Sequence, residues 1–123
     1  MSKDFIPYQE ALELKELGFD EPCFGWFTDS YLRIGFVESK HVQGEDETLA
    51  PTYSQAFRWF REKYCLYHSI GLDNSLEDDV NCDYQIINHS QSISESETDF
   101  KTYEEAELEC LKKLIEIVKE NKQ

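Results

Sequence analysis

Apolar side chains recur at helical spacing in three stretches of the chain. The clearest stripe lies in residues 50–64, where the apolar positions share the three- and four-residue spacing that puts side chains on one helix face. Its members are Tyr53, Ala56, Phe57, Phe60 and Tyr64. Charged residues occupy most of the positions between them, as on a solvated helix face. The pattern predicts a central helix that starts at Ala50-Pro51, with further helices near the two ends of the chain.

Local signals mark the ends of the outer helices. Pro7 suits the first turn of a helix, where its missing N–H leaves no hydrogen bond unmade. Gly18 follows the last apolar position of that helix and predicts a left-handed C-terminal cap. Thr102 and Glu105 have the spacing of a capping box, so a third helix is expected to begin there.

Period-two alternation predicts four strands, over residues 23–28, 31–37, 66–72 and 82–88. In the second strand the alternation marks a core face made of Leu32, Ile34 and Phe36. In the fourth strand we expect Tyr84 and Ile86 to point inward. Residues 1–5 are interpreted as a frayed lead-in, residues 38–50 as a polar loop and residues 89–99 as a flexible acidic loop.

The resulting order, αββαββα, predicts a single α+β domain over residues 1–123. We expect one four-stranded antiparallel sheet with three helices mainly on one of its faces. The order of the strands in that sheet does not follow from the pattern.

The charge is strongly negative, with 26 acidic residues against 12 Lys and Arg and a net charge of −14. Such a field disfavours direct binding to nucleic acids or anionic membranes and permits a basic partner. Residues 73–99 hold eight acids and no Lys or Arg. Neither a membrane-spanning run nor a signal-peptide core is recognisable, so a cytoplasmic location is expected, with four reduced and mostly buried cysteine thiols.

Three blocks carry a family resemblance. They are YQEALELKELGFDEPC at 8–23, APTYSQAFRWFREKY at 50–64 and YEEAELECLKKLIEIVK at 103–119. These blocks resemble a family of small uncharacterised phage and prophage proteins, often of the Bacteroidetes. The resemblance implies a phage or mobile-element origin and a cytoplasmic setting, and it implies no activity.

Residues that could carry chemistry are few. Cys65 and His68, together with Cys82 and His89, have the ligand types of a zinc site, but the second pair is widely spaced and core thiols explain the cysteines better. Residues 73–84 alternate oxygen ligands like a calcium loop without its glycine and final glutamate. With no nucleophile motif and no phosphate loop, we expect no cofactor, no metal and no enzymatic activity.

Two candidate surfaces for a partner follow. One is the outer face of the central helix, with Arg58, Trp59 and Glu62, where a partly exposed tryptophan could anchor a protein contact. The other is the acidic cluster of Glu77, Asp78 and Asp79. The leading hypothesis is a non-catalytic module that binds a host or phage protein. A DNA-mimic inhibitor of a nucleic-acid-binding protein and an enzyme of unrecognised type are the alternatives.

Overall fold

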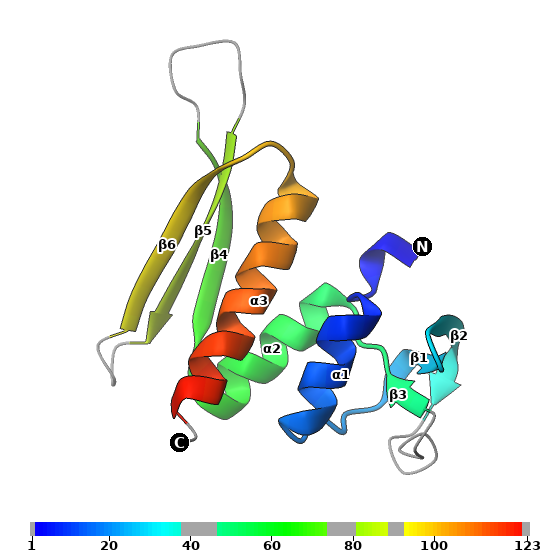
Figure 1. Ribbon diagram of the computed structural model, residues 1–123. Coiled ribbons are helices and arrows are strands. Elements are labelled where there is room, and N and C mark those ends of the chain that lie inside the picture. Colours follow the sequence, from blue (N-terminus) through cyan, green and yellow to red (C-terminus); the bar gives the residue numbers. More distant parts are fainter. Residues whose placement is uncertain (1, 38–46, 74–80, 89–92, 122–123) are drawn as a thin grey trace. The chain divides into compact units, whose positions relative to one another are not determined.

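The computed structural model describes residues 2–37, 47–73, 81–88 and 93–121 (Figure 1). The chain divides into two compact units, Met1–Ala56 and Phe57–Gln123, and the division falls inside one helix. The described residues contain three α-helices and two three-stranded antiparallel sheets. The α+β class is therefore confirmed, whereas the single four-stranded sheet is wrong. None of these helices is long and apolar enough to cross a bilayer.

The first unit joins one helix to a small sheet. Its elements are the 3₁₀ helix Ser2–Asp4, α1 at Tyr8–Glu16, β1 at Cys23–Thr28, β2 at Tyr31–Val37, β3 at Glu47–Leu49 and the start of α2, which spans Tyr53–Tyr64. The strand order is β2-β1-β3. Strand β3 lies within residues 38–50, which were predicted to be a loop, so that prediction is wrong at residues 47–49.

Helix α1 ends as its glycine predicts. Gly18 has a φ of 95°, in the left-handed region that favours glycine. The N–H of Phe19 donates to the carbonyl of Leu14 at 2.9 Å, and the N–H of Gly18 donates to that of Lys15 at 3.1 Å. This pair of bonds is a Schellman motif, and it satisfies two carbonyls that the helix leaves unpaired. Phe19 folds back and is buried.

Residues 2–5 form a 3₁₀ helix and a β-bridge, contrary to the frayed lead-in expected at residues 1–5. Phe5 forms an isolated antiparallel bridge with Thr52, and the N–H of Ile6 donates to the carbonyl of Pro51. The ring of Phe5 lies against Gly25, where an added Cβ would come within 2.8 Å of a ring carbon. A glycine in β1 therefore lets the lead-in pack onto the strand.

Helix α2 begins two residues later than predicted. Its N-cap is Thr52, whose hydroxyl accepts a hydrogen bond from the N–H of Gln55 at 3.2 Å. Pro51 thus precedes the cap.

The second unit packs one long helix on a sheet. Its sheet has the order β4-β5-β6, with β4 at Tyr67–Asp73, β5 at Asn81–Asn88 and β6 at Ile93–Phe100. Helix α3 spans Tyr103–Asn121 and lies along one face of that sheet (Figure 1). The flexible loop expected at 89–99 is wrong from residue 93 onward, because Ser- and Glu-rich β6 pairs with β5 from Ile93 to Glu97 and again at Phe100.

The core of this unit lies between β5 and α3. Strand β5 buries alternate side chains, at Cys82, Tyr84, Ile86 and Asn88, so the inward positions predicted for Tyr84 and Ile86 are confirmed. Helix α3 buries a continuous stripe made of Ala106, Cys110, Leu111, Leu114, Ile115, Ile117 and Val118. Its N-terminus is capped as predicted, because the N–H of Glu105 donates to the Thr102 hydroxyl at 3.0 Å.

The C-terminus of α2 is held by a residue in an unfavourable conformation. Cys65 has a φ of 57°, and its N–H donates to the carbonyl of Arg61 at 3.1 Å. This is the left-handed C-terminal cap that glycine usually provides. The side-chain amide of Asn88 donates to the carbonyl of Tyr64 at 3.1 Å and satisfies another end group of the helix.

We predict that Cys65→Gly stabilises the protein. A left-handed conformation costs a non-glycine residue about 1–2 kcal/mol, and glycine adopts it without that cost. Glycine also makes the unfolded chain more flexible, which offsets roughly 0.5–1 kcal/mol of the gain. The free energy of unfolding in urea should therefore rise by about 0.5–1 kcal/mol. Cys65→Ala is the matched control, since alanine keeps the Cβ and removes the exposed thiol. An equal gain in both variants would assign the effect to the thiol and contradict this account of the cap.

Candidate binding surfaces

The β1–β2 hairpin presents aromatic side chains on the face that points away from its own core. The opposite face carries Phe27, whose ring meets that of Tyr8 in α1 at 5.2 Å between centroids. Because strand neighbours alternate, Phe24 and Trp26 lie on the outer face. The register pairs Trp26 with Arg33 and Thr28 with Tyr31, which places those two residues of β2 on the same face. We call Phe24, Trp26, Tyr31 and Arg33 the hairpin face.

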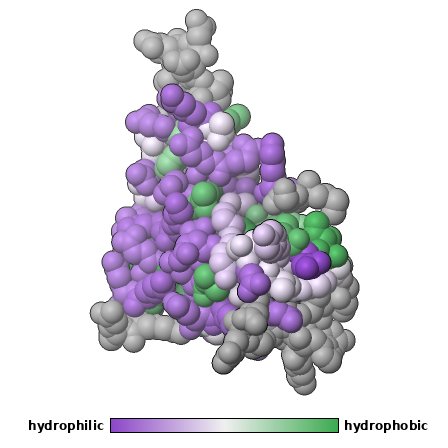
Figure 2. All heavy atoms as spheres, turned by 45° about the vertical axis from the view of Figure 1, so that its right-hand side comes forward, coloured by the Kyte–Doolittle hydropathy of each residue, from purple (hydrophilic) through white to green (hydrophobic). Residues whose placement is uncertain are grey.

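The hairpin face is open to solvent. Phe24 is 63% exposed and Tyr31 is 73% exposed, both far above what large apolar side chains of a core show. The Trp26 ring lies over Gly35, where an added Cβ would meet a ring carbon at 3.4 Å. In Figure 2 hydrophobic side chains gather as a green patch on the unit that carries this hairpin. The surface thus combines rigid aromatic rings with one arginine.

The predicted core face of β2 is only partly correct. Leu32 is half-buried, but Ile34 is 49% exposed although it pairs with the buried Gly25 of β1. Phe36 lies at a position whose side chain is outside the described residues. Strand β2 is the edge of its sheet, and its residues have a neighbouring strand on one side alone among the described residues.

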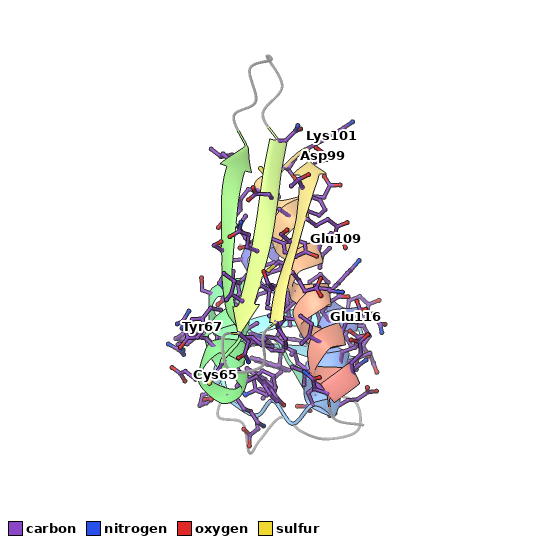
Figure 3. All side chains as sticks on the ribbon, turned by 90° about the vertical axis from the view of Figure 1, so that its left-hand side faces the viewer. Cys65, Tyr67, Asp99, Lys101, Glu109 and Glu116 are labelled. Carbon is purple, nitrogen blue, oxygen red and sulfur yellow. The ribbon has the colours of Figure 1, made fainter. Side chains whose placement is uncertain are left out.

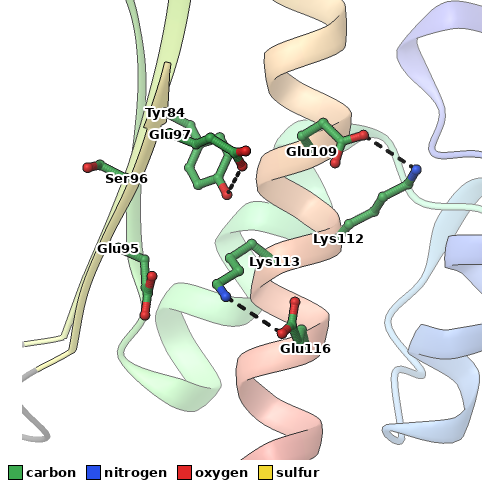
Figure 4. Close-up of a pocket in the computed structure, with 8 residues that line it drawn as sticks. All are labelled: Tyr84, Glu95, Ser96, Glu97, Glu109, Lys112, Lys113 and Glu116. Carbon is green, nitrogen blue, oxygen red and sulfur yellow. Dashed lines mark hydrogen bonds and ion pairs between the residues drawn. The ribbon is translucent and has the colours of Figure 1, made fainter. Parts of the chain in front are cut away.

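A polar groove of about 380 Å³ runs between β6 and α3 in the second unit (Figure 4). It is lined by Tyr84, Glu95, Ser96, Glu97, Glu109, Lys112, Lys113 and Glu116. The register pairs Glu95 with Ile86 and Glu97 with Tyr84, so both carboxylates are on the sheet face that α3 covers. Glu109 and Glu116 project from α3 beside β6 (Figure 3).

The two lysines of the groove are bound to their own helix. Lys112 Nζ lies 3.6 Å from Glu109 Oε1, and Lys113 Nζ lies 3.6 Å from Glu116 Oε1. In the described part of the chain no ion pair reaches Glu95 or Glu97. Four carboxylates against two ammonium groups leave the groove negative.

Tyr84 ties the sheet to the groove. Its hydroxyl donates to Glu97 Oε2 at 3.1 Å, and its ring stacks on Phe100 with 5.8 Å between centroids. Burial raises the pKa of Tyr84, and the hydrogen bond to Glu97 and the negative charge of that carboxylate raise it further. The phenol therefore stays neutral and fixes the Glu97 side chain at the rim of the groove.

The outer face of α2, which the sequence predicts to be a binding surface, does not expose its tryptophan. Arg58 and Glu62 are exposed, but Trp59 is buried, with 6% of its surface accessible. Its ring meets Phe60 and Tyr64 edge-on, and the Lys63 ammonium lies 5.1 Å from its centroid. The expected partial exposure of Trp59 is wrong, because the side chain is buried and its ring contacts two aromatic residues of the same helix. The acidic cluster of Glu77, Asp78 and Asp79 lies outside the described residues.

The structure does not bring together the three candidate zinc ligands that it describes. His68 pairs with Ile86, whereas Cys82 pairs with Leu72, four residues further along β4 and hence about 13 Å away. Cys65 is exposed and Cys82 is buried, and His89 lies outside the described residues. No cluster of metal-ligating side chains occurs in the part of the chain that the structure describes.

His68 is instead held as a neutral aromatic ring. It stacks on Phe57 with 3.8 Å between centroids and 21° between the ring planes. Burial lowers the pKa of His68, and the positive charge of Arg61 lowers it further. Both effects disfavour the imidazolium form in the folded protein.

This predicts a loss of stability on mild acidification. Below its ordinary pKa of about 6.5 the unfolded chain binds a proton at His68 that the folded chain does not, so the free energy of unfolding falls as pH drops towards the lowered pKa. His68→Phe keeps the stack and cannot titrate. Urea unfolding at a series of pH values should therefore show a steeper decline from pH 7 to 5.5 for the natural sequence than for the variant. Parallel declines would contradict a neutral His68.

No protein-family model, no curated protein and no solved structure matches the chain. The resemblance of the three sequence blocks to phage proteins stays a prediction.

The hairpin face escaped sequence reasoning for a definite reason. Alternation in β1 separates Phe24 and Trp26 from Cys23, Gly25 and Phe27, but two aromatic-rich faces leave open which of them is buried. The signal that could have decided it was Gly25, since close backbone packing belongs on a core face.

Proposed function

We propose that the protein is a non-catalytic module that binds a partner protein through the hairpin face. The observation that carries this proposal is the pair of exposed aromatic rings, Phe24 and Tyr31, which lie beside Trp26 and Arg33 on one face of the hairpin. Tryptophan, tyrosine and arginine are the residues that most often dominate the energy of protein interfaces. A host or phage protein is the expected partner, because three blocks of the sequence resemble phage and prophage proteins.

The packing of the hairpin supports this use. The inner face already meets α1 and Phe5, so the outer rings are not needed to close the core of this unit. Leaving them in water forgoes roughly 1.5–3 kcal/mol for each large apolar side chain that a contact could bury. A partner that covers them would recover that free energy. The rings also sit on paired strands, which limits the entropy that binding would cost.

The DNA-mimic hypothesis rests on the acids of residues 73–99, and those that the structure describes do not share one surface. Glu95 and Glu97 face α3, whereas Asp83 alternates with Tyr84 and lies on the opposite face of the sheet. An array that imitates a nucleic-acid backbone needs its charges on one surface. For Glu77, Asp78 and Asp79 the hypothesis stays a prediction.

The proposal predicts that a photo-cross-linker at Tyr31 captures a partner. Benzoylphenylalanine is placed at position 31, at position 58 on the outer face of α2, or at position 16 on α1, and each variant is irradiated in the cells that naturally contain the protein. A discrete heavier product is expected from position 31. A second change, Phe24→Ser, should reduce its yield at least about tenfold, since losing a buried Phe contact costs roughly 1.5–3 kcal/mol.

The control positions decide between surfaces. Products of equal yield from positions 16 and 31 would contradict a specific hairpin face. A product at position 58 with none at 31 would return the contact to α2. A product of twice the chain's own mass would replace the partner by a second copy. Because Phe24 is 63% exposed, Phe24→Ser should change the free energy of unfolding by no more than about 0.5 kcal/mol.

A further inference from the structure

Strand β6 forms an edge of the second sheet. Its order, β4-β5-β6, gives β6 one neighbour within the described residues. Six of its eight residues are exposed. The outward N–H and C=O groups of such a strand are a template on which another extended chain can add.

The groove lies where the side chains of an added strand would go. Glu95 and Glu97 reach from β6 towards α3, and Lys113 and Glu116 reach back from the helix (Figure 4). A strand that continues the sheet beyond β6 places every second side chain on this same face. Those side chains would enter the groove between β6 and α3, while the intervening ones would stay on the open face with Ser94 and Ser96.

The charges of the groove select the occupant. Both lysines of the groove are paired with carboxylates on α3, whereas Glu95 and Glu97 form no ion pair in the described part of the chain, so the four carboxylates outnumber the two ammonium groups. The hydroxyl of Tyr84 orients the Glu97 side chain through its hydrogen bond to the carboxylate. Lysine or arginine side chains of an incoming strand would meet these two carboxylates. The net charge of −14 would also steer a basic segment towards the protein.

A second copy of this chain fits the edge poorly. Pairing β6 with β6 would bring Glu95, Glu97 and Asp99 of one copy against the same acids of the other, and like charges on adjacent strands destabilise a sheet.

The bulge of β6 sets the length of the site. The register shifts between Glu97 and Phe100, and Asp99 has a φ of 74°, so regular pairing ends after residue 97.

We propose that the edge of β6 binds an extended basic peptide segment as an added strand. The segment pairs with residues 93–97 and places Lys or Arg at alternate positions in the groove, against Glu95 and Glu97. This site is separate from the hairpin face, which belongs to the other unit, so each proposal can fail without the other.

The test uses the peptide TKVKVKT with a fluorescent label and measures its affinity by anisotropy at physiological salt. The peptide TKKKVVT has the same composition without the alternation. Two further versions carry N-methyl groups on the lysine amides or on the valine amides. Methylation removes the donors along one edge of a strand and leaves the other edge intact, so strand addition has a distinctive signature.

We expect TKVKVKT to bind at least about tenfold more tightly than TKKKVVT, a difference of about 1.4 kcal/mol. One of the two methylated versions should lose binding about tenfold and the other should keep it. The double variant Glu95→Gln/Glu97→Gln should weaken binding about tenfold as well. Glu16→Gln/Glu62→Gln removes the same charge from exposed helix positions outside the groove and should leave the affinity within about twofold.

Three results would overturn the proposal. The first is absence of binding to the natural protein at millimolar peptide. The second is equal affinity for the alternating, permuted and methylated peptides, which would reduce the effect to bulk charge. The third is an equal loss in the groove variant and its control. Phe24→Ser should not change peptide binding, and that arm separates this site from the hairpin face.

Discussion

The packing of α3 on the inner face of β5 is the constraint on which the second unit depends. Strand β5 pairs with both other strands of its sheet and buries every second side chain beneath the helix. This fixes which face of β6 looks towards α3, because paired residues share a face. Glu95 and Glu97 are therefore aimed at the helix, and Tyr84 holds one of them by a hydrogen bond. The groove is a consequence of that register.

The two units expose surfaces of opposite chemistry. The hairpin face offers aromatic rings and one arginine, which suit a partner that can bury apolar area. The edge of β6 offers backbone groups flanked by carboxylates, which suit an extended basic chain. Neither surface needs the other. The distinct chemistry of the two proposed surfaces allows the contribution of each to be measured separately.

The sequence predicted the elements whose signals are local. The N-cap at Thr102 and the glycine cap at Gly18 rest on contacts within a few residues, and the inward positions of β5 follow from the alternation of its own side chains; the structure has each of them. Prediction from the sequence failed where pairing with a distant strand determines the structure. Strand β6 has a disorder-like composition, and it becomes a strand because β5 supplies hydrogen bonds and Tyr84 supplies a partner for Glu97. The same dependence on pairing hid the two sheets.

The candidate surfaces were missed for related reasons. Trp59 lies off the apolar stripe of α2, yet its side chain is buried and contacts Phe60 of the same helix. Amide hydrogen exchange of β6, followed by NMR, tests the central claim that this segment is an open edge strand. The account predicts alternation over residues 93–97, with amides that face β5 protected and those between them exchanging quickly. Uniformly fast exchange would show the loop that composition suggests, and uniformly slow exchange would show an edge already covered. Either result would contradict the account.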